Sequence, residues 1–131
     1  MKKVLIVDDA SVVRLMIKKV LNKGDFEIVG EAATGTEALT KYKDLRPDVV
    51  TMDITMPEVD GIQATKDIMA FDENAKVVII SGIDQKEMLW QAIKAGAASY
   101  IVKPFENDRV ISTLNEVTAG NSSPEGKDLT R

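Results

Sequence analysis

The stretch that decides the fold is Val49-Val50-Thr51-Met52-Asp53-Ile54-Thr55-Met56-Pro57. It begins as a short, continuous apolar run rich in β-branched residues, bounded by Arg46-Pro47-Asp48 on one side and by Pro57 on the other. Such a run is typical of a strand that is buried on both faces of a parallel sheet. Asp53 appears where the run stops, and open α/β sheets bind their ligands at the carboxyl ends of strands. Taken alone, this aspartate is better explained as the cap of the next loop.

The length and composition indicate one soluble globular domain. The chain has 131 residues, of which 44% are hydrophobic and 29% are charged. No apolar run approaches the length needed to span a bilayer, and Met1-Lys2-Lys3 leads straight into a strand instead of a signal peptide. We therefore expect a cytoplasmic protein without membrane contact. The net charge of -4 argues against nucleic acid as a direct ligand, because a basic surface is absent.

Two residue types are missing, and their absence excludes several chemistries. The sequence contains no cysteine, which rules out disulfides, thiolate metal sites and cysteine nucleophiles. It also contains no histidine, so an imidazole base, a phosphohistidine and a histidine-ligated zinc site are excluded. Any metal must then be held by oxygen ligands, which suits Mg²⁺ or Ca²⁺.

Apolar runs and helical stripes alternate along the chain. Four further strands are predicted at residues 4–7, 26–32, 76–80 and 99–102, the second of them mixed in polarity like an edge strand. Apolar residues at helical spacing follow each strand, and the last stripe ends near residue 117. This order predicts an α/β fold, a doubly wound, five-stranded parallel sheet with helices on both faces. We expect the domain to cover residues 1–119 and a disordered polar tail to cover residues 120–131.

Local signals predict where two of the helices begin. Thr36 is a reasonable N-cap for the second helix. Asp84, followed by Glu87, is typical of a capping box that opens the fourth helix. Trp90 lies on that fourth helix, and we assign it to the core instead of an exposed surface.

Polar residues stand where four of the predicted strands end. These residues are Asp8 and Asp9, Asp53, Ser81 and Lys103. Because the carboxyl ends of parallel strands face the same way, we expect these side chains to converge on one cleft. Carboxylates packed together repel one another and tend to keep their protons unless a cation intervenes. A hard divalent ion such as Mg²⁺ relieves that repulsion and prefers carboxylate, water and phosphate oxygens.

The same cluster has the parts of an anion site with a nucleophile. Lys103 supplies a positive charge for a phosphoryl oxygen, and the Ser81 hydroxyl can donate to another. Without histidine or cysteine, a carboxylate is the nucleophile that needs no base, and Asp53 is the candidate. The Lys103-Pro104 bond is of the kind that can be cis, which would orient the lysine.

Four stretches resemble the receiver domain of two-component response regulators: Asp8-Asp9, Asp53-Ile54-Thr55-Met56-Pro57 with Asp60-Gly61, Ser81-Gly82, and Tyr100-Ile101-Val102-Lys103-Pro104-Phe105. The resemblance covers about residues 2–118. It implies a flavodoxin-like strand order of 2-1-3-4-5. Within that family, the two acidic segments look most like the stand-alone chemotaxis regulators.

The resemblance assigns a role to each matching residue. Asp53 is implied to be the phosphoacceptor, and Asp8, Asp9, Asp53 and the backbone carbonyl of Thr55 the Mg²⁺ ligands. The remaining roles are Lys103 as phosphoryl contact, through a cis Lys103-Pro104 bond, Ser81 as switch hydroxyl and Tyr100 as switch aromatic.

The resemblance also implies partners and an output. The phosphoryl donor is a phosphohistidine on a partner histidine kinase, and the chain is then a signalling switch that modifies only itself. The output target docks on the face of the fourth helix, fifth strand and fifth helix, and a flagellar motor switch protein is the candidate. Phosphorylation acts there by biasing a two-state element. Three departures concern the lifetime of the phosphorylated state: Ser instead of Thr at position 81, Gly82, and Ile83.

Several other interpretations are weighed against the switch. One is a receiver that belongs to a longer regulator, such as a DNA-binding transcription factor. Another is a haloacid-dehalogenase-like phosphatase, but Thr55 stands where that chemistry needs a second acid. A flavin or nucleotide module is disfavoured because acids, and no glycine-rich loop, follow the first strand. The last, a docking module that is never phosphorylated, conflicts with the complete set of acids, hydroxyl and lysine.

Overall fold

The computed structural model describes residues 1–120. The strands are β1 (Lys2–Val7), β2 (Phe26–Ala32), β3 (Val49–Asp53), β4 (Val77–Gly82) and β5 (Ser99–Lys103). The helices are α1 (Ser11–Leu21), α2 (Gly35–Leu45), α3 (Gly61–Phe71), α4 (Lys86–Lys94) and α5 (Asn107–Thr118). Strand and helix alternate throughout, as the apolar pattern predicts. The expected tail beyond residue 120 lies outside the described residues.

All strands lie parallel in one sheet, in the order β2-β1-β3-β4-β5. This is the 2-1-3-4-5 order that the family resemblance implies. β3 occupies the centre, and every residue of it is buried, because it pairs with β1 on one side and β4 on the other. β2 is an edge strand of mostly intermediate burial, which explains its mixed polarity.

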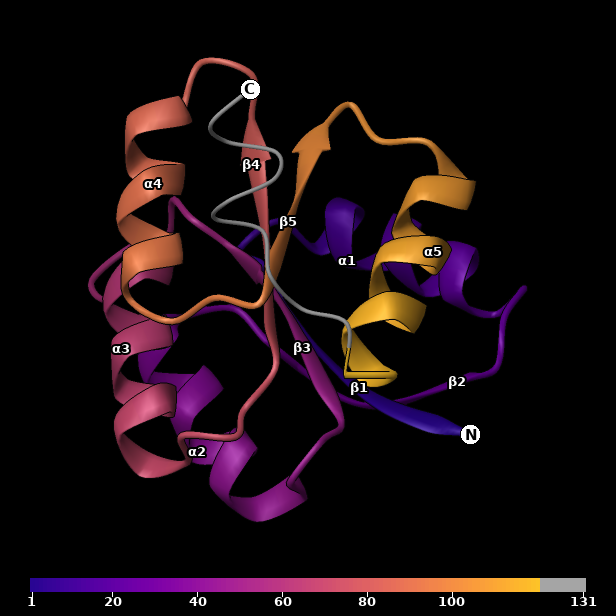
Figure 1. Cartoon of the computed structure of the whole chain (residues 1–131), viewed down its shortest axis with the longest axis horizontal. Helices are drawn as coiled ribbons and strands as arrows, with labels where there is room; N and C mark the ends of the chain where they lie inside the picture. The colour runs from indigo at the N-terminus through magenta and orange to yellow at the C-terminus, as the bar shows by residue number, and fades with distance from the viewer. Residues whose placement is uncertain (121–131) are drawn as a thin grey trace.

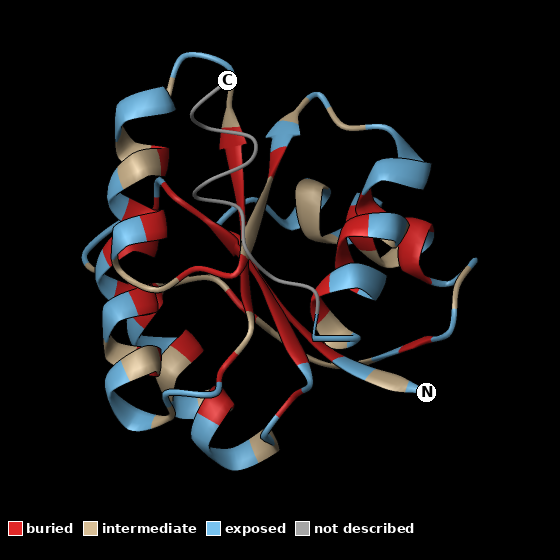
Figure 2. Ribbon diagram, in the orientation of Figure 1, coloured by how far each residue is buried: buried red, intermediate tan, exposed pale blue. Residues whose placement is uncertain are grey.

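The helices form two layers around this sheet (Figure 1). α2, α3 and α4 cover one face, and α1 and α5 cover the other. Side chains alternate along the strands, so Val50 and Met52 face the first layer while Val49 faces the second. Figure 2 shows the buried residues concentrated on the strands and on the sheet-facing sides of the helices.

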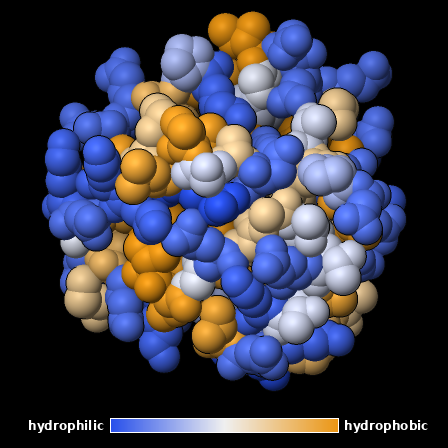
Figure 3. Space-filling view, turned by 180° about the vertical axis from the view of Figure 1, so that it is seen from behind, coloured by the Kyte–Doolittle hydropathy of each residue, from blue (hydrophilic) through white to orange (hydrophobic). Residues whose placement is uncertain are grey.

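The surface is mostly hydrophilic with a few apolar patches. The view from behind shows these patches among charged and polar side chains (Figure 3). Large apolar side chains that remain exposed include three on α1, namely Val12, Leu15 and Met16. None of the described helices is both long enough and apolar enough to cross a bilayer.

Both predicted helix caps are wrong. α2 begins earlier than expected, with Thr34 as N-cap, and the Thr34 hydroxyl accepts a hydrogen bond from the Glu37 N–H. The reason is tertiary: the Gly35 N–H donates to the carbonyl of Val59, which fixes the start of the helix. α4 begins later than expected, with Gln85 as N-cap, and the Gln85 side chain makes no capping hydrogen bond.

Trp90 belongs to the surface instead of the core. Its side chain is half-buried and lines a surface groove together with polar side chains of α4, namely Lys86, Glu87, Gln91 and Lys94. The core-facing positions of α4 are Leu89, Ala92 and Ile93. The apolar face that α4 packs against the sheet therefore does not include Trp90.

Candidate functional site

The residues predicted from the strand ends lie at the carboxyl edge of the sheet. Asp8 and Asp9 follow β1, Asp53 is the last residue of β3, and Lys103 is the last residue of β5. Ser81 lies near the end of β4, one residue beyond Ile80, which pairs with Asp53. The parallel topology therefore gathers side chains that are up to 95 positions apart in the sequence.

Three carboxylates form the centre of the site. Each of Asp8, Asp9 and Asp53 offers an oxygen that lies within 4.8 Å of the others. Asp8 and Asp53 are buried, whereas Asp9 is exposed. The Lys103 ammonium Nζ lies 3.6 Å from Asp53 Oδ1, so one positive charge faces three acids. The three carboxylates are close enough together to hold a metal ion between them.

Burial makes two of these acids reluctant to ionise. The pKa of Asp53 is raised to about 6, first by desolvation and next by the charge of Asp8, while Lys103 acts in the opposite direction. The pKa of Asp8 is also raised, mainly by burial. Such shifts are typical of functional sites, because a structure that is stable for its own sake pairs its buried charges.

Two buried polar atoms of the site lack a partner within the described residues. The Asp8 carboxylate accepts the Ala10 N–H at Oδ1, but within the described residues its Oδ2 makes no hydrogen bond. The Ser81 hydroxyl is 1% exposed and is also unpaired. Burying an unpaired polar atom is unfavourable. These two atoms therefore fit a cation and an anionic ligand, and the donor set suits a hard divalent ion.

A glycine after Asp53 sets the shape of the β3–α3 loop. The Gly61 N–H donates to the Ile54 carbonyl over 2.7 Å. A Cβ at Gly61 would lie 2.0 Å from the backbone oxygen of Asp53, so any larger residue would displace the strand end. Asp60 caps α3 by accepting the N–H of Gln63. The Asp60-Gly61 pair of the sequence thus fixes the backbone beside Asp53.

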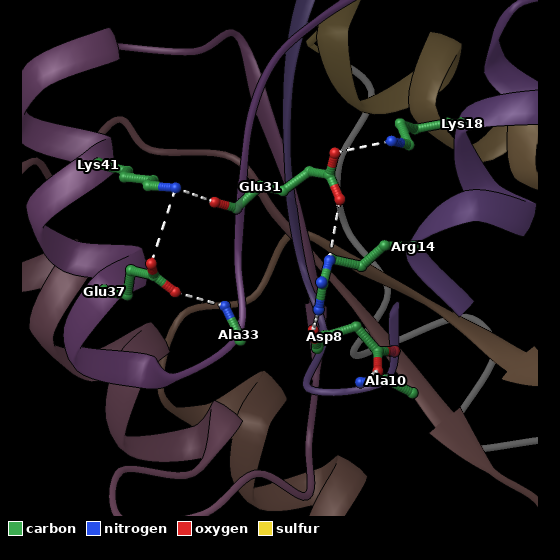
Figure 4. A network of polar contacts seen from close by, with 8 residues as sticks. All are labelled: Asp8, Ala10, Arg14, Lys18, Glu31, Ala33, Glu37 and Lys41. Carbon is green, nitrogen blue, oxygen red and sulfur yellow. Dashed lines mark hydrogen bonds and ion pairs between the residues drawn. The ribbon is translucent and has the colours of Figure 1, made fainter. Parts of the chain in front are cut away.

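Sequence reasoning missed the residues that hold the Asp8 turn in place. Arg14, which the helical pattern assigns to the solvent side of α1, donates through Nη1 to the backbone carbonyl of Asp8. Its Nε donates to Glu31 on β2 over 2.9 Å, and Lys18 donates to the other Glu31 oxygen over 2.8 Å (Figure 4). The strand pattern could not have identified Glu31, because β2 is mixed in polarity and also carries Glu27.

A second missed residue is Gln85. Its side-chain amide accepts the Gly82 N–H and donates to the Thr55 hydroxyl. Thr55 itself is exposed in the loop after β3. No sequence motif points to this glutamine, since Gly82 ends β4 whereas Thr55 lies 30 positions before Gln85 in the loop after β3.

Two further predicted positions are seen on β5. The Lys103-Pro104 bond is cis, as the resemblance implies. Tyr100 is half-buried on the same strand, opposite Ile79 of β4.

The fold and this site together define an α/β protein of flavodoxin-like topology with an acidic centre at the strand ends. Comparison with known proteins narrows that class. The sequence profile of the response regulator receiver domain matches residues 4–115. The chain is 54% identical to chemotaxis protein CheY of Thermotoga maritima over 117 residues, covering 89% of this chain and 98% of that protein.

Two other matches agree. Chemotaxis protein CheY of Bacillus subtilis is 51% identical over 114 residues, covering 87% of this chain and 95% of that protein. Among solved structures, the CheX-CheY-BeF3-Mg complex of Borrelia burgdorferi matches with a TM-score of 0.83 and 37% identity, covering 88% of each chain. The chain belongs to the response regulator receiver domain family, and its function is that of a signalling receiver.

Proposed function

We propose that this receiver is switched by phosphorylation of Asp53, with a histidine kinase as the phosphoryl donor. The observation that carries the proposal is the site itself: a buried carboxylate with a raised pKa, beside two more acids and 3.6 Å from a lysine. Such an arrangement is costly for the fold unless it serves a ligand. Mixed anhydride formation is known chemistry for carboxylate nucleophiles.

Mg²⁺ is the proposed cofactor. Asp8, Asp9, Asp53 and the backbone carbonyl of Thr55 would hold it, and the unpaired Oδ2 of Asp8 supports that assignment. The ion would supply positive charge that lets three carboxylates ionise together and that neutralises phosphoryl oxygens. The Lys103 ammonium adds a second positive charge from the other side of Asp53.

In the proposed reaction, an Asp53 carboxylate oxygen attacks the phosphorus of a phosphohistidine. A P–O bond forms, the P–N bond breaks, and the electron pair stays on the imidazole nitrogen of the donor. The chain has no histidine, so the donor belongs to another protein. The chain turns over no small substrate in this scheme and catalyses only its own modification.

The proposed response begins at Ser81 and Tyr100. The Ser81 hydroxyl, which has no hydrogen-bond partner among residues 1–120, moves toward the phosphoryl group, and the Tyr100 ring turns inward. The face formed by α4, β5 and α5 then changes its affinity for an output target. The relatives named chemotaxis protein CheY support a role in chemotaxis, in the cytoplasm, with a flagellar motor switch protein as target.

The test is the intact mass of the protein after incubation with acetyl phosphate and Mg²⁺. We expect a single phosphoryl adduct that disappears in Asp53→Asn and in a sample treated with a chelator. Asp25→Asn, which removes an exposed acid outside the site, serves as the matched control and should retain the adduct. The proposal is wrong if neither acetyl phosphate nor a panel of phosphorylated histidine kinases modifies Asp53.

A further inference from the structure

One glutamine side chain joins the two loops that flank Asp53. The Gly82 N–H donates to Gln85 Oε1 over 2.6 Å, and Gln85 Nε2 donates to Thr55 Oγ1 over 2.7 Å. A backbone N–H can only donate, so the amide oxygen must face Gly82 and the amide nitrogen must face Thr55. The direction of both hydrogen bonds is thereby settled.

The two ends of this bridge stand beside the proposed switch residues. Gly82 directly follows Ser81, and Thr55 lies two residues after Asp53. The bridge therefore joins the residue after Ser81 to a residue two positions beyond Asp53. The oxygen and nitrogen of an amide are held in one rigid plane, so the bridge fits one spacing of the loops.

The bridge is made in the arrangement in which the switch hydroxyl is disengaged. Ser81 Oγ is buried and makes no hydrogen bond within the described residues. Between Gly82 and Gln85, Ile83 is 79% exposed and Asp84 is also exposed. Burial of side chains therefore does not hold this loop. It is held by the backbone hydrogen bond from the Gln85 N–H to the Gly82 carbonyl and by the two hydrogen bonds of the Gln85 side chain.

The amide is not occupied in capping the helix. Gln85 is the N-cap residue of α4, yet its side chain makes no capping hydrogen bond. Its Oε1 instead accepts the Gly82 N–H three residues earlier, and its Nε2 donates across to Thr55 in the β3–α3 loop. A simple capping role thus fails to account for its contacts.

We propose that Gln85 is a positioning residue that latches the β4–α4 loop to the β3–α3 loop in the unphosphorylated state. The proposal rests on the proposed function of Asp53 and extends it. Phosphorylation must then supply the free energy that is needed to break these hydrogen bonds. Removing the latch raises the population of the competent state, and a ligand that selects that state then binds more tightly.

The latch itself is tested in the unmodified protein. Gln85→Met keeps the length of the side chain and removes both polar atoms. We expect hydrogen exchange of the Gly82 amide, followed by NMR in the full chain, to become about tenfold faster because its acceptor is lost. Gln91→Met, an exposed position of the same helix, should leave that rate unchanged. An unchanged Gly82 rate in Gln85→Met overturns the latch.

The effect on switching is tested with beryllofluoride and Mg²⁺, which imitate the phosphoryl group without a covalent step. We expect Gln85→Met to bind beryllofluoride about three- to tenfold more tightly than the original chain, the scale of one or two net hydrogen bonds. The Gln91→Met control should bind as the original chain does. Equal or weaker binding by Gln85→Met overturns the proposal.

The two hypotheses fail in different ways. The proposed function fails if the original chain does not bind beryllofluoride at all, or if it binds it no more tightly than the Asp53→Asn variant does. In that case there is no switch for the latch to restrain. If the original chain binds it through Asp53 while Gln85→Met shows no gain, the latch alone fails.

Discussion

The Asp53 carboxyl group lies where burial and the neighbouring Asp8 carboxylate both oppose its ionisation. Its pKa is about 6 in the folded chain, against an ordinary value of 3.8. The folded chain therefore binds this proton more tightly than the unfolded chain does. By linkage, the resulting loss of stability is absent below about pH 4, grows between about pH 4 and 6, and is complete above that range.

Asp53→Asn should therefore stabilise the protein at neutral pH when divalent cations are absent. The shift in pKa, which already includes the opposing effect of Lys103, corresponds to at most about 3 kcal/mol of unfolding free energy. Urea denaturation at about pH 7.5 and again near pH 3.5 measures the effect. The gain should vanish at the lower pH, where the native carboxyl is also neutral. A variant that is less stable at both pH values would contradict this account.

Glu31 connects β2 to α1 and, through Arg14, to the turn that carries Asp8. The Arg14 and Lys18 side chains donate to its two carboxylate oxygens, and these contacts lower its pKa. The lowered pKa contributes stability above the ordinary value of 4.5, which is lost as the pH falls through the folded-state pKa. The side chain is 34% exposed, so the energy of the pair itself is small.

We expect Glu31→Gln to weaken Mg²⁺ binding by about three- to tenfold, because Arg14 loses the partner that orients it toward the Asp8 carbonyl. Glu37→Gln is the matched control. It removes the same charge from the same polar network (Figure 4), but Glu37 bonds to Ala33 and pairs with Lys41 instead of Arg14. Titration of Mg²⁺ followed by NMR distinguishes the two. Equal loss in both variants would mean that net charge, and not Arg14, sets the affinity.

The opposite end of the α2 and α3 layer has its own polar anchor. The Tyr42 hydroxyl, on a side chain that is almost wholly buried, donates to Asp72 Oδ2 over 2.8 Å, and its ring meets Phe71 edge-on. This hydrogen bond is the main reason that the pKa of Asp72 is lowered. The stability that it gives is present above the ordinary Asp72 pKa of 3.8 and is lost on acidification below it.

Tyr42→Phe should lower the unfolding free energy at pH 7 by about 1 kcal/mol, the usual net value of one hydrogen bond. The Asp72 pKa should rise toward 3.8 in the variant, which NMR titration of the carboxyl can follow. Because Tyr42 lies on α2 and outside the acidic site, phosphorylation by acetyl phosphate should not change. A lost adduct in this variant would show that the two ends of the sheet are coupled.

At the scale of the whole molecule, the sheet separates two apolar cores and leaves its carboxyl edge polar. The two core clusters lie on opposite faces of the same strands. The three acids therefore gather at an edge where neither apolar core supplies a charge or hydrogen-bond donor to balance their negative charge. A cation at that edge favours the folded chain, because the unfolded chain does not assemble the three carboxylates.

Mg²⁺ should thus raise the stability of the folded protein, by about 1.4 kcal/mol at a free concentration ten times the dissociation constant. The gain should fall below about pH 6, because protons compete for Asp53. Thermal unfolding with Mg²⁺ and with a chelator, at two pH values, measures both effects. Asp8→Asn should lose the response to Mg²⁺. A response that survives in this variant would place the ion elsewhere.

The sequence by itself determined the alternation of strands and helices and the residues of the acidic site. Burial on both faces makes each central strand an unbroken apolar run, so the length of the run and its polar end are readable locally. Asp53 at the end of β3 and Lys103 at the end of β5 follow from that pattern once the strands are taken as parallel. The family resemblance supplied the strand order, which the structure confirms.

Only the tertiary structure decided how that site is supported. The start of α2 depends on the carbonyl of Val59, and Gln85 acts between loops whose bonded residues are 30 positions apart. Arg14 has the spacing of a solvent-facing residue, but the fold brings the Asp8 carbonyl within its reach. Helical and strand periods report which face of an element is buried. They do not report which polar group from a distant segment meets the other face, because that depends on how the elements pack.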